Sequence, residues 1–301
     1  MSRIHEALKK AELERISTYG DFAASALEVQ EKTPSVGGPV LAQPPIVTIE
    51  PQPNIRFEDL QTRCIQLWQQ PDRQTNVFNP GSSAKAAEQF RTLRSRLYQY
   101  RMSQPLKTLL ITSAISGEGK TFVGTNLGHA IARQSERRVL LIDADLRQSQ
   151  MHVSLGAQSS PGLTDYLRGA IGEMGVIQYS PENNLCFIAG GKEVPNPSEL
   201  LFNGRLAILL ERITPLFEWI ILDSPPSVPV ADASVLAEHC DGLVVVVRAH
   251  TTPIAVAQKG VQELQGKKVV GVVLNGVEEN ALAYGSYHPT HGQEYVKELK
   301  P

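Results

Sequence analysis

Short apolar runs alternate with helical patterns through the second two-thirds of the chain. Six runs of three to six residues are dominated by apolar side chains, and most stretches between them place apolar residues at helical spacing. Continuous apolar runs of this kind are typical of a parallel sheet that helices cover on both faces. The predicted strands are 109–111, 139–143, 185–188, 219–223, 242–247 and 269–274. The predicted helices are 83–100, which precedes the first strand, and 122–132, 197–213, 231–238 and 253–264, which lie between strands.

The chain before residue 82 lacks this alternation. Residues 2–15 predict a short helix that places Ile4, Leu8 and Ala11 on one face. Two outcomes remain open for this helix. It docks on a partner or a neighbouring subunit, or it frays, because isolated helices shorter than about 12–15 residues are marginal in water.

Three parts of the chain follow from these patterns. Six prolines between residues 33 and 53 predict an extended linker, and the brief helix expected over 57–68 has no evident role. The expected architecture is an α/β P-loop NTPase domain with a mostly parallel twisted sheet and helices on both faces. A flexible N-terminal region and a short disordered C-terminal tail are expected to flank it. The predicted boundaries are 1–81, 82–278 and 279–301.

Composition and charge narrow the class of protein. Of 301 residues, 42% are hydrophobic and 20% charged, which is ordinary for a globular protein, and the net charge of −2 provides no basic field for nucleic acid. The three cysteines are scattered singly, and an odd count without a secretory signal indicates a reducing compartment. No run approaches the roughly 20 apolar residues of a membrane span. We therefore expect a cytoplasmic protein that binds no nucleic acid.

The best-defined motif begins at Ala114, directly after the first predicted strand. Gly117, Gly119, Lys120 and Thr121 follow it, and a helical pattern comes next. This order predicts a phosphate-binding P-loop, with alanine where the first glycine often stands. Glycine lets backbone N–H groups close around phosphate oxygens, the lysine reaches the outer phosphates, and the threonine hydroxyl can bind Mg²⁺. The alternative is a chance Gly-Lys-Thr turn.

Three aspartates end two of the predicted strands. Asp143 and Asp145 follow one apolar run, and Asp223 ends another. Because ligands of open parallel sheets collect at the carboxyl ends of strands, all three are expected beside the P-loop. Mg²⁺ prefers hard oxygen ligands and keeps several waters, which suits carboxylates and a hydroxyl. The alternative for each aspartate is a helix cap or a turn.

Several segments resemble a known family. The residues IILDSPP at 220–226 and DADLR at 143–147 look like the Walker B and Walker A′ motifs of the bacterial tyrosine kinases of capsule and exopolysaccharide systems. These BY-kinases are P-loop proteins related to the MinD/ParA ATPases. The segment NPSELL at 196–201 matches the family pattern NPxELL, and the resemblance extends over about 84–277.

Departures from the family pattern leave the nucleotide ligands intact. Many members have proline where this chain has Ser116 and Ser149. MinD/ParA ATPases carry an extra lysine early in the P-loop, where this chain has Ile115 or Ser116, and its absence favours the kinase branch. The tail holds fewer tyrosines than in many members.

The resemblance implies a role for each site residue. Lys120 stabilises charge on the transferred phosphate, while Thr121 and Asp223 hold Mg²⁺. Asp143 and Asp145 share the binding of metal-bound water and the acceptance of the attacking hydroxyl's proton, with Asp143 favoured as the base although sequence does not separate the two. The implied nucleotide contacts, with ATP as the nucleotide, are Ser116, Gly117, Glu118, Gly119, Lys120, Thr121, Phe122 and Asn275, the last lying near the adenine or serving as a simple turn residue.

The tail and one helix carry further expectations. Three of the eight tyrosines, Tyr284, Tyr287 and Tyr295, lie in the last 23 residues and are the candidate phosphoacceptors. The pattern Glu88-x-x-Arg91-x-x-Arg94 resembles the family's oligomerisation motif, which implies a homo-oligomeric ring in which a neighbour's tail enters the site; the alternative is a solvated charged face. The implied activator is an integral-membrane polysaccharide chain-length regulator, which recruits the chain to the inner face of the membrane.

Three functions therefore compete. The first is an ATP-dependent protein-tyrosine autokinase that regulates exopolysaccharide synthesis or export. The second is a MinD/ParA-type ATPase switch without kinase activity, for which the tail tyrosines are incidental. The third is a non-catalytic nucleotide-binding scaffold, which the intact lysine, threonine and aspartates disfavour.

Overall fold

The chain separates into two units, Met1–Gln52 and Pro53–Pro301, and only the second contains residues whose structure is described. The helix expected over 2–15, the proline-rich linker and the tail tyrosines lie outside the described residues. None of the helices in the described ranges is both long and apolar enough to cross a bilayer. The computed structural model describes residues 55–64, 75–134, 137–180 and 184–277.

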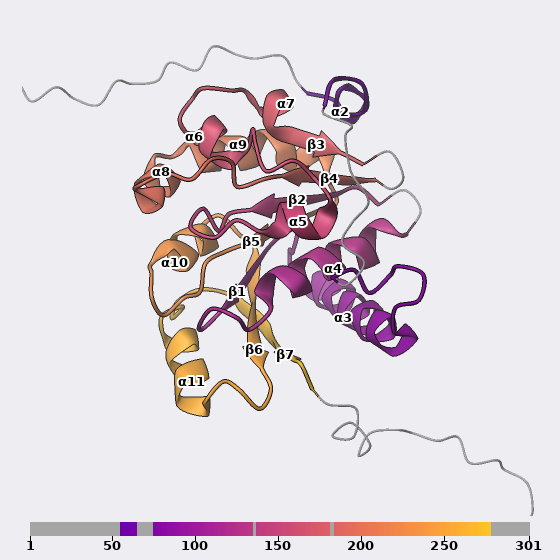
Figure 1. The fold of residues 1–301 in the computed structure, drawn as a ribbon, viewed down its shortest axis with the longest axis vertical. Helices are drawn as coiled ribbons and strands as arrows, with labels where there is room; N and C mark the ends of the chain where they lie inside the picture. The colour runs from indigo at the N-terminus through magenta and orange to yellow at the C-terminus, as the bar shows by residue number, and fades with distance from the viewer. Residues whose placement is uncertain (1–54, 65–74, 135–136, 181–183, 278–301) are drawn as a thin grey trace, which may run out of the picture. The chain divides into compact units, whose positions relative to one another are not determined.

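A seven-stranded sheet forms the centre of the second unit (Figure 1). Its strand order is β3-β4-β2-β5-β1-β6-β7, and every pairing is parallel except that of β3 with β4. The expected mostly parallel P-loop fold is thus confirmed. The strands are β1 (Thr108–Ser113), β2 (Val139–Asp143), β3 (Ile177–Tyr179), β4 (Leu185–Ile188), β5 (Trp219–Asp223), β6 (Gly242–Arg248) and β7 (Val269–Asn275).

Helices cover both faces of the sheet, as Figure 1 shows. One buried apolar cluster lies beneath α3, α4 and α5, and a second lies beneath α2 and α6 to α10. The described helices are α2 (Phe57–Arg63), α3 (Ala84–Ser103), α4 (Lys120–Ala132), α5 (Met151–Leu155), α6 (Leu163–Leu167), α7 (Glu173–Val176), α8 (Pro197–Phe202), α9 (Arg205–Ile213), the 3-10 helix η1 (Thr214–Leu216), α10 (Asp232–Ala237) and α11 (Ile254–Gln262).

The expectation of one continuous helix over 197–213 was wrong. The structure divides this segment into α8 and α9 at Asn203 and Gly204. Gly204 has φ of +78°, a left-handed conformation that glycine adopts without strain, and the Asn203 side chain accepts a hydrogen bond from the Arg205 N–H at 3.0 Å. The Asn-Gly pair was the available sequence signal for this break.

Helix α2, which had no role at the level of sequence, packs into the core. Phe57 and Leu60 are buried, and the Phe57 ring lies edge-on to Tyr179 of β3 with centroids 6.3 Å apart. The Arg138 guanidinium lies 4.2 Å from the Phe57 centroid. Helix α2 is therefore part of the folded unit.

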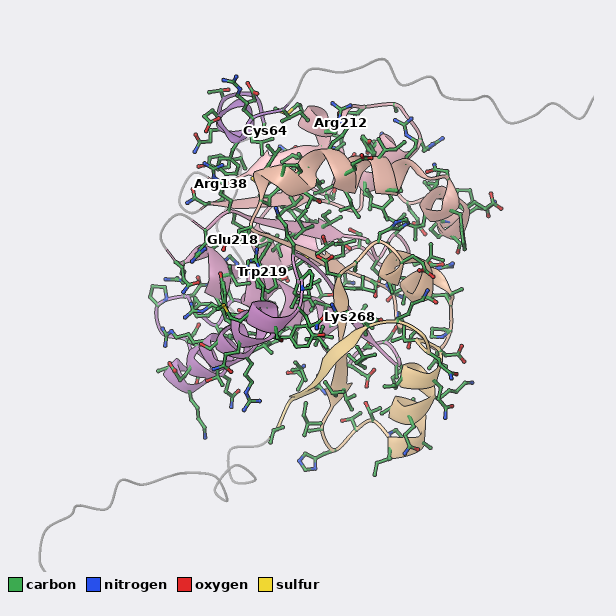
Figure 2. All side chains as sticks on the ribbon, turned by 180° about the vertical axis from the view of Figure 1, so that it is seen from behind. Cys64, Arg138, Arg212, Glu218, Trp219 and Lys268 are labelled. Atoms are coloured by element: carbon green, nitrogen blue, oxygen red, sulfur yellow. The ribbon has the colours of Figure 1, made fainter. Side chains whose placement is uncertain are left out.

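The two ends of the strands differ in chemistry. Arg138, Glu218 and Trp219 lie where β2 and β5 begin (Figure 2). Trp219 is fully buried, with the Arg101 guanidinium 5.2 Å from its ring, and Glu218 pairs with Arg137. Side chains at the amino-terminal ends of the strands thus pair with one another. A ligand site is expected at the carboxyl-terminal ends, as is usual for open parallel sheets.

Candidate active site

The loop between β1 and α4 has the backbone that the P-loop motif predicts. Gly117 and Gly119 have φ of +85° and +90°, in the left-handed region that glycine tolerates. A Cβ on Gly119 would lie 2.1 Å from the Asn275 side-chain nitrogen, so this position also excludes any larger residue. Helix α4 begins at Lys120, which directs its free N-terminal N–H groups to the loop.

Lys120 lies between the carboxylates expected from the sequence. Its Nζ atom is 3.0 Å from Asp145 Oδ2, and both side chains are largely buried. Burial alone lowers the pKa of Lys120, but the charges of Asp223 and Asp145 outweigh it and hold that pKa above the usual value. The lysine is therefore fully cationic and available to phosphate oxygens.

Thr121 and Asp223 meet across the loop. The Thr121 hydroxyl donates to Asp223 Oδ2 at 2.5 Å, while Asp223 Oδ1 is buried and has no hydrogen-bond partner among the described residues. Burial raises the pKa of Asp223 to about 8; Lys120 opposes the shift and Asp143 adds to it. The parallel register accounts for this proximity, because Asp223 lies opposite Asp143 of β2 and Ile111 of β1.

Asp143 is held by the loop that follows β2. Its Oδ2 atom accepts hydrogen bonds from the Ser149 hydroxyl at 2.7 Å and from the Met151 N–H at 3.0 Å. Burial raises the pKa of Asp143 to about 6, against the effect of these donors. Sequence reasoning noted Ser149 only as a departure from the family pattern and missed its contact with the aspartate.

The donor set fits Mg²⁺. Across the described ranges, no three His, Cys, Asp or Glu side chains form a ready-made metal cage. Mg²⁺ usually keeps several waters and binds through one or two carboxylates plus substrate phosphates, so such a cage is not required. The Thr121 hydroxyl and the unpartnered Asp223 oxygen are hard oxygen donors beside the phosphate-binding loop. These two residues fit the predicted metal role.

The Glu118 side chain turns into the protein. It is 1% exposed, and its carboxylate accepts hydrogen bonds from the Ile115 N–H at 2.8 Å and the Thr252 hydroxyl at 2.7 Å. The Arg248 N–H lies 3.4 Å from the same carboxylate, and the Asn275 amide donates to the Glu118 carbonyl at 2.9 Å. The sequence pointed to Asn275 and Glu118 separately and missed Arg248 and Thr252.

A second unpredicted network anchors the loop after β2. The Arg147 guanidinium donates to Asp232 at 2.8 Å and to the Ser198 hydroxyl at 2.8 Å, and Ser198 donates to Asp232 at 2.6 Å. These contacts join the DADLR segment to α8 and α10. The family resemblance named the segments of Arg147 and Ser198, but nothing in the sequence linked them.

The Glu-Arg-Arg helix uses its charges in different ways. Arg91 pairs with Glu88 at 2.9 Å, one turn away on the exposed face of α3. Arg94 instead donates to the Ala130 carbonyl of α4 at 2.6 Å. Within one chain, then, Glu88 and Arg91 remain on the surface, and Arg94 joins α3 to the P-loop helix.

Phe122 and Asn275 border a groove beside the P-loop. Phe122 packs edge-on against Phe90, with centroids 5.8 Å apart. The groove has a volume of about 1610 Å³ and lies among α3, α11 and the end of β7. Because Phe122 and Asn275 both line it, the groove offers room for a base next to the loop. The three candidate acceptor tyrosines lie outside the described residues.

Comparisons with known proteins agree with this geometry. Residues 109–286 match the family model described as CobQ/CobB/MinD/ParA nucleotide binding domain. The chain is 35% identical to the tyrosine-protein kinase CpsD of Streptococcus agalactiae over 206 residues, which are 67% of this chain and 89% of that one. It is 36% identical to the tyrosine-protein kinase etk of Escherichia coli strain K12 over 213 residues, 70% of this chain but 29% of etk.

A solved structure extends the similarity to three dimensions. The kinase domain of Escherichia coli tyrosine kinase ETK superposes with a TM-score of 0.63 at 32% sequence identity, and the match covers 80% of this chain and 91% of that domain.

Proposed function

The chain belongs to the bacterial tyrosine kinases within the CobQ/CobB/MinD/ParA nucleotide-binding family, and from that premise we propose that it phosphorylates tyrosines in the C-terminal tails of neighbouring copies of itself. Its relatives make it a protein-tyrosine kinase and disfavour the ATPase switch without kinase activity. The observation that carries the proposal is the convergence of three distant segments, in which Lys120 contacts Asp145 and Thr121 contacts Asp223.

Each residue then has a task in phosphoryl transfer. The backbone of the loop encloses the phosphates, and Lys120 moves from Asp145 to the phosphate oxygens, where charge spreads during transfer. Thr121 and Asp223 would hold Mg²⁺, which when bound offsets charge on the β- and γ-phosphates. Asp143 and Asp145 share the acceptance of the tyrosine proton. We favour Asp143 as the base, because burial raises its pKa to about 6, close to the pH at which a general base is effective.

The acceptors we propose are Tyr284, Tyr287 and Tyr295. A tyrosine must approach the γ-phosphate in line, which a neighbour's tail can do within a ring. The exposed pair formed by Glu88 and Arg91 supports a role in that ring, because an arginine on a surface can also pair with a partner's carboxylate.

The setting that we propose follows the resemblance seen in the sequence. The kinase regulates exopolysaccharide or capsule synthesis or export from the cytoplasm. An integral-membrane chain-length regulator activates it at the inner face of the membrane. The adenine of ATP would occupy the groove beside Asn275 and Phe122.

Mapping of phosphotyrosine tests the proposal. Purified protein is incubated with ATP, Mg²⁺ and the cytosolic segment of the regulator, and modified tyrosines are identified by mass spectrometry. We expect phosphotyrosine in the tail of the wild type and none in Lys120→Met. Release of inorganic phosphate without any phosphotyrosine would contradict the proposal and favour the ATPase switch.

A further inference from the structure

Glu118 is a buried carboxylate inside the loop that must receive phosphates. A charged group this deep is costly unless its oxygens accept hydrogen bonds. One oxygen accepts from the Ile115 N–H at 2.8 Å, and the other accepts from the Thr252 hydroxyl at 2.7 Å and lies 3.4 Å from the Arg248 N–H. These donors are neutral and come from the loop itself, from the last residue of β6 and from the segment between β6 and α11. The carboxylate thus joins two segments that are 130 residues apart.

The carbonyl groups of the same loop are also held. The Arg248 guanidinium lies 3.4 Å from the Gly117 carbonyl, and the Asn275 amide donates to the Glu118 carbonyl at 2.9 Å. A trans peptide is planar, so each C=O points away from the N–H of the following residue. Fixing these two carbonyls therefore directs the N–H groups of Glu118 and Gly119 to the opposite side of the loop.

That orientation is what phosphate binding requires. A concave set of backbone N–H groups binds an anion only when successive peptide planes hold them on one side. Both Gly117 and Gly119 have positive φ, so glycine leaves these planes free to rotate unless another group fixes them. The contacts that fix these planes come from the loop itself, through the Ile115 N–H, and from Arg248, Thr252 and Asn275 outside it.

We propose that Glu118, Arg248, Thr252 and Asn275 form a clamp that sets the phosphate-binding conformation of the loop, with Glu118 as its central positioning residue. The clamp determines nucleotide affinity, whereas the aspartates and Lys120 determine the rate of transfer. The inference rests on nucleotide binding at this loop and assigns Asn275 a contact with the loop in addition to any with the adenine.

Two variants test the clamp. Glu118→Ala removes the central carboxylate, and Thr252→Val removes one donor with little change in shape. We expect the dissociation constant of a fluorescent ADP analogue to rise roughly tenfold in the first and a few-fold in the second, in line with the usual worth of lost hydrogen bonds. The KM for ATP should rise by similar factors, while kcat at saturating ATP should stay close to the wild-type value. Thr252→Ser retains the hydroxyl and should bind like the wild type.

A matched control separates positioning from general stability. Glu173 is a largely buried glutamate on α7 that pairs with Arg212 at 2.6 Å. Glu173→Ala should lower the melting temperature without changing nucleotide affinity. If it weakens nucleotide binding as much as Glu118→Ala does, the effect is structural and the proposal is wrong.

The double variant gives the sharpest result. Because Thr252 acts through Glu118, Glu118→Ala combined with Thr252→Val should bind no more weakly than Glu118→Ala alone. Fully additive losses would overturn the clamp, as would wild-type affinity in Glu118→Ala. A wild-type protein that binds no nucleotide would overturn the proposed function itself, a distinct result obtained before any variant is measured.

Discussion

The two sides of the P-loop hold buried carboxylates in opposite states. On one side, Asp143 and Asp223 have pKa values raised to about 6 and about 8 by burial, and one Asp223 oxygen has no partner among the described residues. On the other side, both oxygens of Glu118 accept hydrogen bonds from neutral donors. On the first side, the unpartnered Asp223 oxygen can still accept a cation. On the second side, the Glu118 carboxylate has its hydrogen bonds without any ligand.

This difference assigns the two sides different roles, catalysis to the aspartates and positioning of the loop backbone to Glu118. The Asp223 oxygen that lacks a donor would be stabilised by added positive charge, which a metal ion and Lys120 can provide. A carboxylate that is fully hydrogen-bonded gains nothing from a cation and instead fixes the backbone around it. Substitutions on the aspartate side should therefore change turnover and metal dependence, whereas substitutions on the Glu118 side should change affinity.

The largest effect is expected for Lys120→Met. Removing the cation leaves the transferred charge without its nearest positive partner, so transfer should slow by about 100- to 1,000-fold. Phosphotyrosine formation from radiolabelled ATP measures this rate. Lys268→Met is the matched control, because Lys268 lies at the opposite edge of the sheet (Figure 2), where it contacts the Pro105 carbonyl and the Tyr100 ring. Equal losses of transfer rate in Lys120→Met and Lys268→Met would show that the effect is not specific to the carboxyl-terminal ends of the strands.

The next effect is a change in metal dependence. Asp223→Asn keeps the shape of the side chain but removes its charge, so the Mg²⁺ concentration for half-maximal activity should rise about tenfold or more. Titration of activity with Mg²⁺ after removal of metal by a chelator measures the change. The Asp223→Asn variant should still fold in the absence of nucleotide. An unchanged Mg²⁺ requirement would show that Asp223 does not serve the metal.

A smaller effect is expected where α11 touches the loop. A Cβ on Gly260 would lie 2.5 Å from the Ala114 Cβ, so Gly260→Ala should destabilise the fold by about 1–3 kcal/mol through overpacking. Denaturant unfolding measures the loss. Ala114→Gly in the same chain removes the nearest clashing atom but leaves the Ala114 Cα 2.9 Å from the new methyl group, so it should restore part of the lost stability. Absence of any rescue would show that α11 does not support the loop through this contact.

The smallest effect concerns Ser149. Ser149→Ala removes one hydrogen bond to Asp143, so kcat should fall only a few-fold, with little change in the KM for ATP. Steady-state kinetics measure both values. Ser95→Ala, which changes an exposed serine of α3, serves as the control. A change in KM alone would place Ser149 with the affinity-determining side instead.

The sequence predicted the aspartate side better than the Glu118 side for a physical reason. Apolar runs mark parallel strands, and a motif residue at a strand end is carried to the common edge by the register, as for Asp143 and Asp223. No comparable sequence pattern predicts the hydrogen-bond partners of Glu118. Arg248 and Thr252 meet it only because β6 and α11 pack beside the loop, a tertiary arrangement that no local pattern encodes.

Short elements were missed for a related reason. Strand β3 has three residues, and α5, α6 and α7 have four or five, too few for a hydrophobic period to emerge. Helix α2 was anticipated over 57–68, but its packing on β3 depended on contacts with residues far along the chain. Apart from the break at Asn203 and Gly204, the long periodic elements were predictable, whereas the short pieces that connect or cover them were not.

One mixing experiment tests the central claim, that this site transfers phosphate to a tail tyrosine of another chain. An isotopically labelled Lys120→Met chain, inactive but with its tail intact, is mixed with a chain in which Tyr284, Tyr287 and Tyr295 are phenylalanine. ATP, Mg²⁺ and the cytosolic segment of the regulator are added, and phosphotyrosine on the labelled chain is measured. We predict phosphotyrosine on the labelled tail in the mixture and none in either chain alone. Steady ATP hydrolysis in the mixture with no labelled phosphotyrosine would contradict the account.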